Sequence, residues 1–116
     1  MSILFTPIDL GNVHAKNRFI HSATYEVMAS ETGEVSDRLI KRYQNLAKGE
    51  VSLIIPGYMY IHSLGRSYKY QTGIHSDSMI PGLSEMVQAV HQEGRMGGQD
   101  ELGTLRGRGA LFGELW

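Results

Sequence analysis

A short apolar run enclosed between two amphipathic helical patterns constrains the fold of this chain more than any other feature. Residues 51–55 are Val-Ser-Leu-Ile-Ile, and Pro56-Gly57 ends the run. Apolar residues recur at spacings of three and four before it, over 37–48, and after it, over 81–93. A short apolar run that follows a helix is typical of a core strand in a parallel sheet.

The first helix is expected from about Asp37 to Lys48. Ser36 or Asp37 can cap its free N–H groups. Gly49 stands where a left-handed residue commonly ends a helix. The second helix is expected from about Pro81, which suits a first turn, to Glu93, with Gly94 as its end.

The N-terminal part of the chain predicts a hairpin and then a strand. Apolar and polar residues alternate on both sides of Gly11-Asn12 over 8–16, and glycine in the first turn position favours a type II′ turn. Residues 18–25 are expected to form a buried strand, because they are rich in aromatic and β-branched side chains. Residues 58–78 are polar and aromatic, which predicts a long loop leaving the end of the strand at 51–55.

The resulting order of strand, helix, strand and helix is typical of a parallel α/β fold. Right-handed crossovers place both helices on one side of a sheet that closes into a barrel. This pattern stops near residue 94, where the glycine-rich stretch 94–113 holds seven of the 14 glycines and has no apolar stripe. We therefore expect a domain boundary there, with 95–116 as a divergent tail that is disordered or translated in a shifted reading frame.

Composition excludes several classes of function. A net charge of -1 gives no electrostatic basis for binding nucleic acid or acidic membranes. The chain has no cysteine, and its five histidines lack the spacing of metal ligands. The N-terminus lacks the pattern of a signal peptide and no apolar stretch approaches the length of a membrane helix, so a cytoplasmic protein is expected.

An ordered series of short motifs resembles the Old Yellow Enzyme family, also called the NADH:flavin oxidoreductase family. No single motif is specific, but their order and spacing over residues 4–94 follow the family. The motifs are Leu4-Phe5-Thr6-Pro7-Ile8, Lys16-Asn17-Arg18, Ser22-Ala23-Thr24-Tyr25-Glu26, Leu53-Ile54-Ile55-Pro56-Gly57, Gly65-Arg66, Gln71-Thr72-Gly73-Ile74, Ile80-Pro81-Gly82-Leu83 and Ala89-Val90-His91.

The resemblance implies a (β/α)₈ TIM barrel with FMN at the mouth formed by the carboxyl ends of its strands. Such barrels take about 250 residues. A chain of 116 residues would supply the N-terminal hairpin and the first two to three βα units.

The resemblance also places candidate cofactor-binding residues. Ala23, Thr24 and Tyr25 end the first strand, where the family offers backbone groups and one side chain to the flavin N5 and O4 edge. By this resemblance, Thr24 or Tyr25 is the residue that tunes the flavin; the alternative is that Tyr25 is a core aromatic residue.

Gly57 and Tyr58 end the second strand. The family has a small residue near the position of Tyr58, so this tyrosine departs from the pattern, and a plain Pro-Gly turn is the alternative. Gln99 corresponds loosely to a glutamine that hydrogen-bonds the flavin pyrimidine; the alternative is a solvated residue in the tail.

The implied activity is hydride transfer from NADH or NADPH through FMN to a small activated alkene or enone. No catalytic residue of this chemistry falls within the chain, since the family's substrate-anchoring pair and phosphate cradle come from later barrel segments. We therefore expect a truncated and inactive fragment. The alternatives are a non-catalytic module that assembles with another barrel fragment and a piece of a different phosphate-binding barrel; the oligomeric state cannot be deduced.

Overall fold

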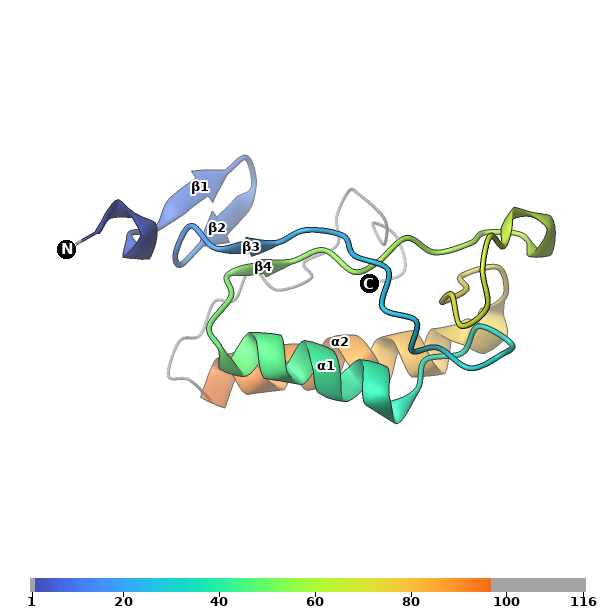
Figure 1. Ribbon diagram of the computed structural model, residues 1–116. Coiled ribbons are helices and arrows are strands. Elements are labelled where there is room, and N and C mark those ends of the chain that lie inside the picture. Colours follow the sequence, from blue (N-terminus) through green and yellow to red (C-terminus); the bar gives the residue numbers. More distant parts are fainter. Residues whose placement is uncertain (1, 97–116) are drawn as a thin grey trace.

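The computed structural model describes residues 2–96 and places two helices on one side of a pair of parallel strands (Figure 1). The helices are α1 (Asp37–Lys48) and α2 (Ile80–Met96). The strands are β1 (Ile8–Leu10), β2 (Val13–Ala15), β3 (Ile20–His21) and β4 (Leu53–Ile54). Short 3₁₀ turns occur at Ile3–Phe5, Ser63–Gly65 and Asp77–Met79. No described helix is both long and apolar enough to cross a membrane. The tail expected over 95–116 falls outside the description from residue 97 on.

Strands β1 and β2 form the predicted hairpin. They are antiparallel, and Leu10 pairs with Val13, so the loop has two residues. Gly11 has a positive φ of 61° and Asn12 does not. Positive φ at the first turn position alone is the φ pattern of a type II′ turn, as the sequence predicted.

Strands β3 and β4 pair in parallel, with Ile20 opposite Leu53. Both are shorter than the predicted strands 18–25 and 51–55. The last backbone hydrogen bond between them runs from Ile55 N to His21 O, at 2.9 Å. In this register the next donor on the β4 side is Gly57 N, which bonds a side chain instead of the backbone of the facing segment. The ladder therefore ends at Ile55.

The predicted burial of the first strand is wrong for its apolar residues. Phe19 is 39% exposed and Ile20 is 48% exposed. Within the described part of the chain, β3 has only β4 as a strand neighbour, so one edge of β3 is left without a paired strand.

Helix α1 has the predicted bounds, and Ser36 caps it: its Oγ accepts a hydrogen bond from Leu39 N at 3.2 Å. The predicted left-handed conformation of Gly49 is wrong, because Gly49 has a φ of -73°. Glu50 takes the positive φ, 65°, instead. Asn17 Nδ2 donates to the Glu50 carbonyl at 2.8 Å, and this contact ties the turn to the N-terminal part of the chain.

Helix α2 begins at Ile80 and continues to Met96, past Gly94, where the sequence predicted its end. Pro81 lies in its first turn, as predicted. The two helices pack against each other under the strands, and the core lies between these layers (Figure 1). The buried core residues are Leu39, Tyr43, Ala47, Ile54, Met79, Leu83, Met86, Val87 and Val90.

The long segment after β4 is tied back to itself. Tyr60 and Gly73 form an isolated parallel bridge, in which Tyr60 N donates to Thr72 O at 3.2 Å and Ile74 N donates to Tyr60 O at 2.9 Å. The residues between them therefore form a loop whose two ends are held together by the bridge. Tyr68 and Lys69 lie in this loop.

Candidate functional site

The structure brings together all the predicted site residues that it describes. The segment 23–25 follows β3 and the segment 57–58 follows β4, and these segments lie side by side. The rings of Tyr25 and Tyr58 have centroids 5.5 Å apart. The carbonyl of Thr24 lies so close to Gly57 that a Cβ there would overlap it. Gln99 lies outside the described residues, so its predicted role stays a prediction.

The segment 23–25 presents free backbone donors. Ala23 and Thr24 are exposed and Tyr25 is half-buried. In the described part of the chain, the amide N–H groups of these three residues have no hydrogen-bond acceptor. A planar ligand with acceptor atoms along one edge could bind them without displacing an internal bond.

The two candidate hydroxyl groups already donate to protein atoms. The Tyr25 hydroxyl donates to the Lys69 carbonyl, and Thr24 Oγ1 donates to the Ser22 carbonyl at 3.1 Å. Each hydroxyl oxygen can still accept a hydrogen bond, but its proton is already donated to a backbone carbonyl. The backbone, rather than either hydroxyl, therefore offers the free donors at this edge.

Three tyrosine rings gather beside these donors. Tyr25 contacts Tyr58, and its ring centroid lies 5.7 Å from that of Tyr68. Partial desolvation raises the pKa of Tyr58, and neighbouring Tyr68 and Tyr25 raise it further. Tyr58 is therefore a neutral, half-exposed ring at neutral pH, and it presents a flat apolar face at the strand ends.

Glu26 is a site residue that the sequence analysis missed. Its Oε1 accepts a hydrogen bond from Gly57 N at 2.5 Å and another from the buried Tyr43 hydroxyl of α1. Burial raises the pKa of Tyr43, and the hydrogen bond and negative charge of Glu26 raise it further. A carboxylate directly after a predicted strand end was the available signal, but only the tertiary structure shows its partners.

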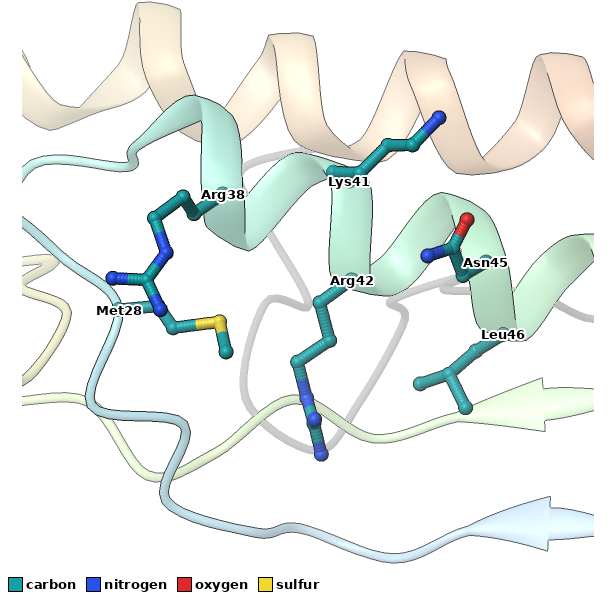
Figure 2. A pocket seen from close by; sticks show the side chains of 6 residues that line it. All are labelled: Met28, Arg38, Lys41, Arg42, Asn45 and Leu46. Carbon is teal, nitrogen blue, oxygen red and sulfur yellow. The ribbon is translucent and has the colours of Figure 1, made fainter.

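A hollow lies elsewhere, along α1. It is lined by Met28, Arg38, Lys41, Arg42, Asn45 and Leu46, and Figure 2 shows Arg38 and Arg42 extending from the helix beside Met28. None of the candidate cofactor-binding residues lines it. Among the described residues, no three His, Asp or Glu side chains lie close enough together to hold a metal ion.

The fold and the site together define a class of protein. Two parallel strands, each followed by a helix on the same side, place a ligand-binding edge at their carboxyl ends. This is the arrangement of enzymes built from parallel βα units, which bind substrates and cofactors at that end of the sheet.

Comparison with known proteins identifies the family. The family model described as "NADH:flavin oxidoreductase / NADH oxidase family" matches residues 3–97, which is most of the chain. The chain therefore belongs to this family, as the ordered motifs indicated. The family's cofactor is FMN, and a reduced nicotinamide is its electron donor.

Individual relatives agree with this assignment. The chain is 37% identical over 94 residues to the metal reductase of Desulforamulus reducens, and the match covers 81% of this chain. A solved 2-naphthoyl-CoA reductase aligns with a TM-score of 0.76 at 34% identity over 79% of the chain. The Old Yellow Enzyme of Pichia sp. AKU4542 aligns with a TM-score of 0.74 at 23% identity over 79% of the chain, which shows a shared fold.

The chain spans only a small part of each of these proteins. It covers 14% of the metal reductase, 14% of the 2-naphthoyl-CoA reductase and 24% of the Old Yellow Enzyme. The described residues form no closed barrel, and they correspond to one α/β piece of these larger folds.

Proposed function

We propose that this chain supplies the opening part of a (β/α)₈ barrel in which FMN transfers hydride from NADH or NADPH to an activated alkene or enone. The observation that carries the proposal is the juxtaposition of 23–25 with 57–58 at the carboxyl ends of β3 and β4. Family membership gives the cofactor, and this juxtaposition supports the proposal that these residues meet it.

The chain's residues fit a flat flavin edge in two respects. Within residues 2–96, the amide N–H groups of exposed Ala23 and Thr24 and of half-buried Tyr25 have no acceptor, so they could donate to the acceptor atoms of the ring. Gly57 has no side chain, so the second strand end can approach the first closely. Tyr58 would border the ring as an apolar wall, and its size departs from the family pattern.

We further propose that these 116 residues do not perform the reaction alone. In barrels of this type, phosphate groups are held by late βα loops, so the described segment would bind only the ring end of FMN. A second candidate function is a module that assembles with another barrel fragment. Phe19 and Ile20 are exposed beside an edge of β3 that pairs with no strand among the described residues, which favours this second candidate. A cytoplasmic location stays a prediction.

A chimaeric enzyme tests the proposal. Residues 1–96 would replace the matching segment of the NADPH dehydrogenase of Halalkalibacterium halodurans, which is 33% identical over 92 residues. The folded chimaera should contain bound FMN and oxidise NADPH with 2-cyclohexenone as acceptor. The 116-residue chain alone should bind FMN weakly or not at all in calorimetry. A folded chimaera without FMN would show that these strand ends do not accept the cofactor.

A further inference from the structure

The two candidate site segments lose their backbone connection before they reach the site. Ile55 N donates to His21 O, and this is the last backbone hydrogen bond between the strands in the described part of the chain. Beyond it, residues 22–26 and 56–58 run side by side without a ladder. Something other than sheet pairing must set their separation.

The Glu26 carboxylate spans this gap. Gly57 N donates to Glu26 Oε1 at 2.5 Å, and the same N–H lies 3.2 Å from the Tyr43 hydroxyl oxygen. The Tyr43 hydroxyl in turn donates to Glu26. One carboxylate therefore ties the segment after β3 to the segment after β4 and to the core side of α1.

The surroundings leave little freedom for this contact. Tyr43 has no exposed surface and Gly57 is buried. A Cβ on Gly57 would overlap Glu26 Oε1 and the Thr24 carbonyl. A buried N–H without an acceptor costs about 1–3 kcal/mol, so the segment at Gly57 is held where the carboxylate can reach it.

The residues that flank this contact are the candidate site residues. Tyr25 precedes Glu26 and Tyr58 follows Gly57, and their rings pack against each other. We propose that Glu26 is a positioning residue, which holds Tyr25, Tyr58 and the free amides of 23–25 at the spacing that the flavin ring requires. This inference rests on the proposed function for its ligand, but the contact itself can be tested without FMN.

Hydrogen exchange of the 116-residue chain, followed by NMR, tests the contact. In Glu26→Ala the Gly57 amide should exchange at least about tenfold faster, as expected for loss of a hydrogen bond to a charged acceptor. Glu26→Gln keeps an acceptor oxygen and should restore most of the protection. The exchange rates of the core amides of Val87 and Val90 should rise less than that of Gly57, because a general loss of stability would raise all of them equally. Exposed Glu31→Gln is the matched control and should change nothing.

The flavin measurement uses the chimaeric enzyme. Glu26→Ala should weaken FMN binding at least about tenfold, comparable to the loss of one such hydrogen bond, and Glu26→Gln should weaken it less. The proposal would be overturned if the Gly57 amide exchanged at an unchanged rate in Glu26→Ala, or if the exchange rates of the core amides rose as much as that of Gly57. Faster Gly57 exchange with unchanged FMN affinity would also overturn it, and in that case the proposed function would stand. A wild-type chimaera that binds no FMN would refute the proposed function and, with it, the positioning role.

Discussion

Gly33 packs directly against the phenol of Tyr60, so closely that a Cβ on Gly33 would overlap the phenol oxygen. The Tyr60 hydroxyl donates to the Thr32 carbonyl at 3.0 Å, and Gly73 N donates to the Gly33 carbonyl at 2.9 Å. This contact joins the loop before α1 to the bridge between Tyr60 and Gly73.

Gly33→Ala should therefore destabilise the protein strongly. Gly33 has a φ of 90°, where an alanine is strained, and the added methyl group would also collide with Tyr60. The free energy of unfolding should fall by about 2–4 kcal/mol, measured by denaturant titration.

Alanine substitutions at two other glycines distinguish the cost of backbone strain from the cost of a steric clash. Gly11 also has a positive φ, but its Cβ would meet nothing within 4 Å, so Gly11→Ala should cost only about 1–2 kcal/mol. Gly65 has neither feature, and Gly65→Ala should leave stability unchanged within about 0.5 kcal/mol. Equal losses for Gly33→Ala and Gly11→Ala would mean that Tyr60 moves aside without cost.

Tyr25→Phe should loosen the loop that carries Lys69. The variant removes the hydroxyl that donates to the Lys69 carbonyl, and loss of one such bond costs about 0.5–1.5 kcal/mol. Hydrogen exchange of residues 66–70 should speed up. Tyr68→Phe is the control, because the Tyr68 hydroxyl makes no hydrogen bond within residues 2–96.

The same Tyr25→Phe substitution decides between two roles for this hydroxyl. The sequence resemblance made Tyr25 a candidate for tuning the flavin, whereas the structure commits its proton to Lys69. In the FMN-loaded chimaera the reduction potential should therefore stay unchanged. A shifted potential with unchanged loop exchange would show that the hydroxyl turns to the cofactor.

Tyr43 makes stability depend on alkaline pH. Its pKa is raised in the folded state above the ordinary value of 10.0, mainly by burial and then by Glu26. Above pH 10 the unfolded chain releases the Tyr43 proton and the folded chain keeps it. The free energy of unfolding should therefore fall as the pH rises, by up to about 1.4 kcal/mol per pH unit from this group.

Urea titrations between pH 9 and 11.5 measure this slope. Tyr43→Phe should be less stable at neutral pH, because Glu26 loses a donor, but its stability should fall less steeply with alkaline pH. Tyr70→Phe, at an exposed tyrosine, is the control. It should keep the part of the pH dependence of stability that comes from Tyr43. An identical slope in wild type and Tyr43→Phe would mean that Tyr43 ionises normally in the folded chain.

Ser36→Ala should weaken the start of α1 by about 0.5–2 kcal/mol, since Ser36 Oγ accepts from Leu39 N. The Ser36 hydroxyl also donates to the Met28 carbonyl, which aspartate cannot do at neutral pH. Ser36→Asp should therefore recover the cap and only part of the stability in thermal unfolding. Full recovery by aspartate would show that the Met28 contact contributes nothing, and exposed Ser67→Ala is the control.

The elements that depend on local pattern were predictable from the sequence. Helix α1 has its predicted bounds and cap, because an amphipathic period and a serine at the N-cap act within a few residues. The β1–β2 hairpin follows from Gly11, whose positive φ carries no steric cost. The ordered motifs indicated the correct family, because order and spacing together are far more specific than any one motif.

Features that depend on distant partners were not predictable from the sequence and follow from the tertiary contacts. The strand ladder stops after Ile55 because the Gly57 amide finds the Glu26 carboxylate, 31 residues away in sequence. The left-handed turn after α1 moves from Gly49 to Glu50, whose carbonyl is held by Asn17. The Tyr25 hydroxyl is committed to Lys69. Such contacts join segments that are far apart along the chain, and no short-range sequence pattern encodes which donor meets which acceptor.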